Sequence, residues 1–168
     1  PKAANLGEII HGKLEGFEVP PGFGIPFHYY AEHLKAAGLD KQITALLADP
    51  AVAKDATLRK QKREQLRKAI ETAPLADDLR KKVEVGLAAL PENQGVFVRS
   101  SHNAEDLPDF NGAGLYDTVP NMRGTDAVLG AIKKVWGSVW NFAAYEDRQR
   151  AGIDQAKVFG SALISCSP

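Results

Sequence analysis

Apolar residues follow two kinds of spacing along this chain, and each kind predicts a different element. Apolar residues three or four positions apart predict amphipathic helices, and compact or alternating apolar runs predict strands. The expected helices cover residues 3–11, 27–37, 40–48, 55–73, 76–89, 126–139 and 140–150. The expected strands cover residues 23–25, 95–98, 115–119 and 157–165. This order predicts one domain of the α/β (α+β) class.

Glycine, proline and capping residues mark several of the expected boundaries. Pro26 follows the first strand directly and restricts it to an edge or an end of a sheet, because proline has no N–H to donate. Gly38 is expected to end the helix that precedes it. Thr125 or Asp126 is expected to cap the helix that begins there.

Residues 40–90 differ from the rest of the chain because Ala, Leu, Lys, Arg and Glu dominate them. Three helices are expected here, and we interpret them as a helical annex. The basic run 59–68 fits either a nucleic-acid patch or the solvated face of a helix. Glu64, Glu71 and the balance of charge favour the solvated face, and a partner-binding surface is the remaining alternative.

Composition excludes several classes of protein. The 168 residues include 21 basic and 21 acidic side chains, so the chain lacks the basic excess that coats nucleic acid or an anionic membrane. Its one cysteine, Cys166, is insufficient for an internal disulfide or a cysteine-rich zinc site. With no long apolar run and no charged-then-apolar leader, we expect a soluble, cytoplasmic protein.

The stretch 99–114, RSSHNAEDLPDFNGAG, concentrates the candidate chemistry. Arg99 at the end of a buried strand is a fixed cation that can make bidentate contacts with phosphate. Gly112 and Gly114 let backbone N–H groups approach a ligand closely, as loops that bind phosphate require. Tight hairpins use glycines at the same spacing, so the residues alone leave a structural role open.

Several segments occur in an order that resembles the N-terminal nucleotide-binding region of the phosphoenolpyruvate synthase and pyruvate phosphate dikinase family. The segments are KAANLGE (2–8), VPPGF (19–23), VRSS (98–101), AEDLP (104–108), GAG (112–114) and VWGSVWN (135–141). The last of these also resembles the form found in glucan water dikinases. Matching segments span nearly the whole chain, and residues 38–90 correspond to a helical insert.

The resemblance implies the first subdomain of an ATP-grasp fold, a mixed sheet of about four or five strands flanked by helices. It implies Mg²⁺ and ATP as cofactors. Members of the family transfer the β-phosphate of ATP to a histidine on a separate domain and from there to an acceptor. Pyruvate is the expected acceptor, with rifampin or a glucan as alternatives. A non-catalytic interaction module of the same fold is the competing hypothesis from another class.

The same resemblance identifies candidate ATP-binding residues: Lys2, Arg99, Ser100, Gly112 and Gly114. Phosphoryl transfer depends mainly on positioning and on neutralising charge, which suits these residue types. The metal-binding acidic pair and the glutamine of the second ATP-grasp half, the phosphohistidine domain and the substrate-binding barrel have no counterpart here. No catalytic or metal-binding residue is therefore assigned, and the chain alone is expected to be inactive.

Each candidate also has a structural interpretation. The structural alternative for Lys2 is a frayed terminal residue. For Arg99 it is an ion pair with Glu105 or Asp106. Those two carboxylates could bind Mg²⁺, but we expect them to organise their loop. His102 is expected to be a solvent-facing loop residue.

Other conspicuous residues are interpreted as structural. Trp136 and Trp140, one helical turn apart, are expected to be core or subdomain-interface residues. His28 and His33 are five positions apart, a poor spacing for joint metal binding on a helix. The chain departs from the family pattern at three positions. Pro1 stands where the family has a glycine, His102 where it usually has a small residue, and Ala143 where many members have arginine.

Overall fold

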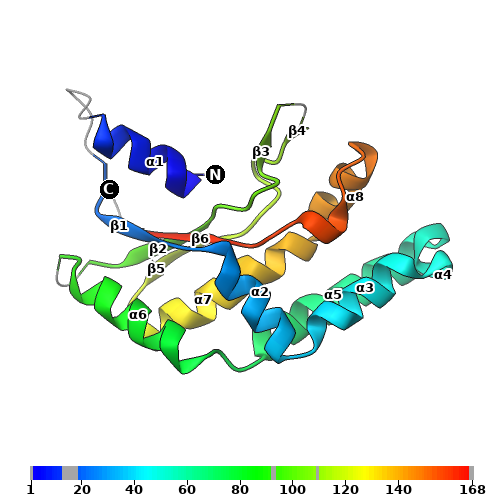
Figure 1. The fold of residues 1–168 in the computed structure, drawn as a ribbon, viewed down its shortest axis with the longest axis horizontal. Helices are drawn as coiled ribbons and strands as arrows, with labels where there is room; N and C mark the ends of the chain where they lie inside the picture. Colours follow the sequence, from blue (N-terminus) through cyan, green and yellow to red (C-terminus); the bar gives the residue numbers. More distant parts are fainter. Residues whose placement is uncertain (1, 13–18, 92–93, 109, 167–168) are drawn as a thin grey trace.

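A computed structural model describes residues 2–12, 19–91, 94–108 and 110–166 (Figure 1). Its helices are α1 (Lys2–His11), α2 (Phe27–Ala36), α3 (Leu39–Ala48), α4 (Pro50–Lys54), α5 (Ala56–Thr72), α6 (Asp77–Ala88), α7 (Thr125–Gly137) and α8 (Phe142–Arg150). Two short 3-10 helices follow α7 and α8, namely η1 (Ser138–Trp140) and η2 (Gln155–Lys157). The strands are β1 (Gly22–Ile25), β2 (Val96–Ser100), β3 (Asp106–Leu107), β4 (Phe110–Asn111), β5 (Thr118–Met122) and β6 (Ala162–Cys166). The predicted α+β class is confirmed.

The main sheet has four strands in the order β1-β6-β2-β5, and β3 pairs with β4 in a small hairpin beside it. Strand β1 lies at an edge, as Pro26 predicted. A mixed sheet was expected, but every pairing among the described strands is antiparallel. Strand β2 is flanked on both sides, with Arg99 opposite Leu163 on β6 and Thr118 on β5. The end of β2 therefore has a fixed place in the molecule.

The two faces of the sheet are covered differently (Figure 1). Helix α7 packs along one face, against β2, β5 and β6, and α5 and α6 pack on α7. Helix α1 lies on the other face, where it contacts β6. Trp136 and Trp140 are buried in the core, as predicted, and each large apolar side chain removed from water contributes roughly 1.5–3 kcal/mol.

The segment 40–90 forms four helices where three were expected. Asp49 caps α4, which begins at Pro50, with its carboxylate accepting from the N–H of Ala51 at 2.8 Å. Asp55 caps α5 in the same way. The inward residues of α5 and α6 join the same core cluster as the sheet; they are Leu66, Ile70, Leu79 and Val83. Only α3, α4 and the first part of α5 extend away from the sheet (Figure 1).

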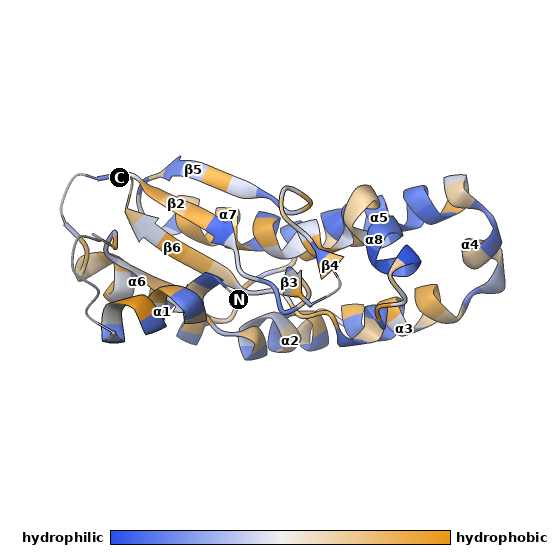
Figure 2. Ribbon diagram, turned by 90° about the horizontal axis from the view of Figure 1, so that it is seen from above, coloured by the Kyte–Doolittle hydropathy of each residue, from blue (hydrophilic) through white to orange (hydrophobic). Residues whose placement is uncertain are grey.

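The basic run 59–68 divides by residue type. Its lysines are exposed, as the solvated-face interpretation predicted, and Figure 2 shows many hydrophilic residues along α5. Arg63, by contrast, is only 1% exposed. The arginines of this run make contacts within the protein and do not form an exposed basic surface.

Three boundaries differ from the sequence prediction. The strand expected over 115–119 is displaced to β5, because the carbonyl of Leu115 accepts from the side chain of Asn141 and residues 112–117 form a turn. The strand expected over 157–165 begins at Ala162, because Asp154 caps η2. Helix α7 has Gly124 as its N-cap, and neither Thr125 nor Asp126 caps it with a side chain.

Within the described part of the chain, no helix combines the length and the apolar character needed to cross a lipid bilayer.

Candidate functional site

The N-terminal helix brings Lys2 to the end of the central strand. The ammonium group of Lys2 donates to the carbonyl oxygen of Ser100 at 3.3 Å, across 98 positions of sequence. The N–H of Ala3 donates to the hydroxyl of Ser101 at 3.0 Å. These contacts dock the start of α1 against β2, so Lys2 is not a frayed residue.

Glu105 links the start of α1 to the end of β2. It is 2% exposed, and its carboxylate forms an ion pair with Lys2. It also accepts hydrogen bonds from the hydroxyl of Ser100 and from the N–H of His102, both at 3.3 Å. Glu105 is therefore a loop organiser, as expected. The cation that it pairs with is Lys2, and among the described residues it has no ion pair with Arg99.

Arg99 occupies the opposite face of β2 from the core residue Val98, because successive side chains of a strand alternate. Its guanidinium lies 5.0 Å from the ring centroid of Phe97, two positions earlier on the same face. The Nε atom is buried and has no hydrogen-bond partner among the described residues. An unpaired buried donor costs about 1–3 kcal/mol. Arg99 as a whole is only half-buried, so part of the residue is accessible to a ligand.

The two candidate glycines have different environments. Gly112 is buried, and its N–H donates to the carbonyl oxygen of Glu105 at 2.8 Å. A Cβ atom there would lie 3.0 Å from the ring of Tyr116. Gly114 is exposed, has φ of 78°, and its N–H has no protein partner within the described residues. Gly112 therefore allows close packing, whereas Gly114 presents a backbone donor to the outside.

His102 is fully buried, which corrects the expectation of a solvent-facing residue. Its Nδ1 accepts from the N–H of Ser161 at 3.1 Å, and its ring meets Tyr116 edge-on with centroids 4.6 Å apart. Burial, reinforced by the positive charges of Arg148 and Lys2, lowers the pKa of His102 to about 3. The polar residues around it in the sequence suggested exposure, but the histidine is a neutral support beneath the site.

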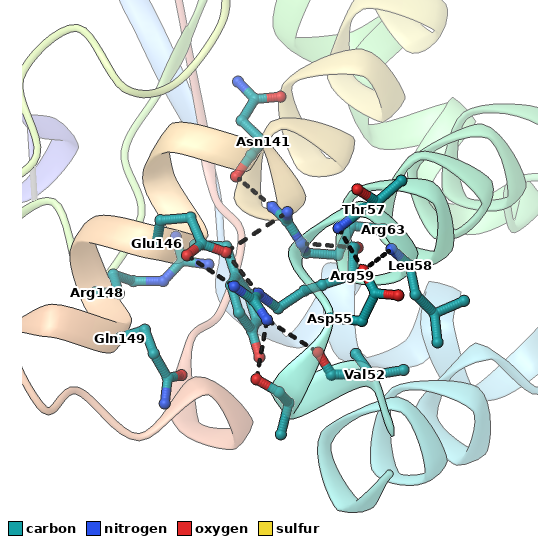
Figure 3. Close-up of polar contacts among 12 residues, drawn as sticks. Val52, Asp55, Thr57, Leu58, Arg59, Arg63, Asn141, Glu146, Arg148 and Gln149 are labelled. Carbon is teal, nitrogen blue, oxygen red and sulfur yellow. Dashed lines mark hydrogen bonds and ion pairs between the residues drawn. The ribbon is translucent and has the colours of Figure 1, made fainter. Parts of the chain in front are cut away.

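A network of arginines on α5, which sequence reasoning missed, joins this helix to α8 (Figure 3). Glu146 of α8 accepts from Arg59 at 2.7 and 3.2 Å and lies 3.8 Å from Arg63. Arg63 is sandwiched between the rings of Phe142 and Tyr145, at 4.5 and 4.7 Å. Burial lowers the pKa of Arg63 to about 10, and Arg59 lowers the pKa of Glu146. The only signal in the sequence is the spacing of arginines at 59, 63 and 67.

The described residues do not form a metal site. No group of three or more His, Cys, Asp or Glu side chains in this part of the chain is placed to hold an ion. His33 is buried with its Nε2 2.8 Å from the carbonyl oxygen of Ile70, so it is an ordinary helix position as expected. The side chain of Asp106 and the residue Pro1 lie outside what the structure describes.

Taken together, the structure gathers Lys2, Ser100 and Glu105 at one end of β2. Gly112 joins them through the backbone of Glu105. Arg99 lies next to them on β2, and Gly114 lies in the adjoining turn. These cations and backbone donors are of the kinds that bind phosphate groups.

Comparison with known families gives the class of protein, an AMP/ATP-binding domain. The matching family is described as "Pyruvate phosphate dikinase, AMP/ATP-binding domain", and its match covers residues 1–165. The chain belongs to this family, which confirms the resemblance seen in the sequence.

Individual relatives agree with this assignment. The chain is 36% identical over 167 residues to a phosphoenolpyruvate synthase of Pseudomonas aeruginosa (strain UCBPP-PA14) and 35% identical over 167 residues to that of Escherichia coli (strain K12). It is also 31% identical over 168 residues to a rifampicin phosphotransferase of a Streptomyces species. These alignments cover 97% of this chain but only 21%, 21% and 18% of the relatives. The chain thus spans about a fifth of the length of the relatives that it matches.

Proposed function

We propose that this chain is the ATP-binding part of a phosphoenolpyruvate-synthase-like dikinase, and that residues 1–168 are the first subdomain of an ATP-grasp fold with a helical insert at about 40–90. The observation that carries the proposal is the meeting of two motifs far apart in sequence. Lys2 of the first motif contacts Ser100, next to Arg99 of the VRSS motif. Two cations at one strand end, in a member of an AMP/ATP-binding family, suit a polyphosphate.

Each candidate residue has a distinct role in this proposal. The ammonium of Lys2 and the guanidinium of Arg99, a residue that is only half-buried, neutralise phosphate charge. Ser100 holds Lys2 with its carbonyl oxygen and Glu105 with its hydroxyl. Gly114 offers its N–H, and Gly112 fixes the start of the turn.

Magnesium does not fit the described residues as a protein-bound ion, because they hold no cluster of three suitable ligands. In this proposal Mg²⁺ arrives on the phosphates of ATP. The chain itself binds and orients the nucleotide, and no step of the reaction is assigned to its side chains.

The phosphoryl acceptor is proposed from the relatives. Pyruvate is favoured because the most similar relatives cited here are phosphoenolpyruvate synthases. Rifampin is an alternative with the same chemistry, supported by the rifampicin phosphotransferase, and a glucan is another. We expect the 168-residue chain alone to form no AMP, and measurable AMP formation by it would contradict this part of the proposal. A non-catalytic interaction module remains the competing hypothesis.

The test is a calorimetric titration of Mg-ATP into the 168-residue chain and into an Arg99→Met variant. Charge-assisted hydrogen bonds are worth about 1.5–3 kcal/mol, so the variant should bind roughly ten-fold or more weakly. Arg80→Met is the matched control, since Arg80 pairs with Asp126 on the exposed surface of α6 and α7. Equal affinity of all three proteins, or no binding by the unchanged chain, would count against the proposed site.

A further inference from the structure

The turn that carries the candidate glycines is bonded by a side chain from a distant part of the sequence, that of Asn141. The amide nitrogen of Asn141 donates to the carbonyl oxygen of Leu115 at 3.1 Å and to the carboxylate of Asp117 at 3.0 Å. Asn141 lies between η1 and α8, 24 or more positions later in the sequence. One planar group thus fixes two points on the far side of the turn.

Asn141 is itself anchored to α5. Its backbone carbonyl oxygen accepts from the buried guanidinium of Arg63 at 3.3 Å, as the dashed line in Figure 3 shows. The second carboxylate oxygen of Asp117 lies 3.7 Å from Arg67, one turn further along α5. Arg63, Asn141, Asp117 and Arg67 therefore form a continuous polar connection between this helix and the turn.

The orientation of the Asn141 amide is determined by its neighbours. The amide nitrogen faces two oxygen acceptors, and the amide oxygen is buried without a hydrogen-bond partner among the described residues. Reversing the amide would place its oxygen against a carbonyl and a carboxylate, which repel it. The protein leaves one buried acceptor unpaired in order to hold the turn.

The middle of the turn has no packing of its own. A Cβ atom built on Gly114 would meet nothing within 4 Å, and the residue is exposed at a φ of 78°. The N–H of Leu115 closes the turn by donating to the carbonyl oxygen of Gly112 at 3.1 Å, so the conformation of Gly114 depends on how the two ends are held. Gly112 bonds to Glu105 at one end, and Asn141 holds Leu115 and Asp117 at the other.

We propose that Asn141 is a positioning residue for nucleotide binding, which fixes the 112–117 turn so that the N–H of Gly114 points toward the phosphates. This inference rests on the proposed function. Asn141 acts through the turn and does not touch the nucleotide. Its hydrogen-bond donor is the property that matters, because a group of the same shape without that donor cannot bond to Leu115 or Asp117.

The test compares Asn141→Asp with Asp55→Ala in the 168-residue chain. The aspartate keeps the shape of asparagine but cannot donate, and it adds a negative charge beside Asp117. Asp55 caps the far end of α5, so its loss destabilises the protein without touching the turn. Three quantities are measured for each protein: the urea midpoint, the Mg-ATP affinity, and hydrogen exchange of the Leu115 amide, which donates to the carbonyl oxygen of Gly112 at 3.1 Å.

We expect Asn141→Asp to exchange at the Leu115 amide at least ten-fold faster and to bind Mg-ATP about five- to ten-fold more weakly. Asp55→Ala should lower the urea midpoint with wild-type affinity and wild-type exchange in the turn. Wild-type affinity in Asn141→Asp would overturn the positioning role, even if stability falls. Unchanged exchange at the Leu115 amide would overturn it independently of nucleotide. Absence of binding by the unchanged chain would overturn the proposed function, and the exchange comparison would still decide whether Asn141 orders the turn.

Discussion

Replacing Lys2 with methionine leaves the carboxylate of Glu105 without its cation. Glu105 has 3% of its side chain exposed and Lys2 has 42%, so the pair is intermediate between a buried and a surface ion pair. Removing one partner of a fully buried pair costs about 3–5 kcal/mol, and exposed pairs are worth about 0–1 kcal/mol. Because Ser100 and His102 still donate to the carboxylate, we expect Lys2→Met to reduce the free energy of unfolding by about 1–3 kcal/mol.

A double-mutant cycle separates the energy of the Lys2–Glu105 ion pair from that of the neighbouring hydrogen bonds. Glu105→Gln removes the charge and keeps the shape, so Lys2→Met should cost much less in that background. The expected coupling is about 1–2 kcal/mol, read from urea unfolding by tryptophan fluorescence, since Trp136 and Trp140 are buried. Additive effects within about 0.5 kcal/mol would refute the reasoning. The double variant should fold but bind Mg-ATP poorly. This result would separate the role of Lys2 in stability from its role in nucleotide binding.

Three further predictions concern residues outside this pair. The pKa of His102 is about 3 in the folded protein and about 6.5 when unfolded, so stability is complete above pH 6.5 and falls by up to about 1.4 kcal/mol per pH unit below it. Urea unfolding between pH 7.5 and 5 should show this slope, and His102→Gln should reduce it. Gly130→Ala, at an exposed position of α7, should stabilise the protein by about 0.5–1 kcal/mol, because alanine has the higher helix propensity. Gly86→Ala should destabilise it by about 1–2 kcal/mol, because a Cβ atom at position 86 would lie 2.7 Å from the ring of Phe23 on β1; thermal melts decide the sign. Glu146→Gln should cost more than Arg63→Met in chemical denaturation, since only the former leaves a buried cation uncompensated; the reverse order would contradict this account.

The elements that the sequence predicts well are those with a strong periodic pattern. Helix α2 begins at Phe27 and ends where Gly38 adopts its left-handed conformation, because the apolar spacing and the glycine point to the same boundary. The edge position of β1 follows from Pro26 alone. In both cases local chemistry and tertiary packing agree, so a reading of adjacent residues is sufficient.

The elements that the sequence predicts poorly depend on distant partners. His102 stands among polar residues, yet Ser161 and Tyr116 enclose it, and neither is near enough in sequence to signal burial. The 115–119 run has strand-forming residues, but Asn141 takes the carbonyl of Leu115 and moves the strand onward. Tertiary hydrogen bonds override local propensity at these positions.

The candidate site, too, could be predicted from the sequence only in part. The residue types and motifs of Lys2, Arg99 and the glycines could be recognised from the sequence through their resemblance to a family. The ion pair between Lys2 and Glu105 could not, because an ion pair with Arg99 was equally consistent with the sequence and only the docking of α1 decides between them.

The central claim is that Lys2, Arg99 and the 112–117 turn bind the phosphates of ATP, and backbone amide resonances test it most directly. Mg-ATP is titrated into the isotopically labelled 168-residue chain, and the shift of each amide is followed. We expect saturable shifts concentrated at Lys2, Arg99, Ser100, Gly112 and Gly114, with little change in α3 and α4. Unmoved resonances at those five amides, or shifts concentrated elsewhere, would contradict it.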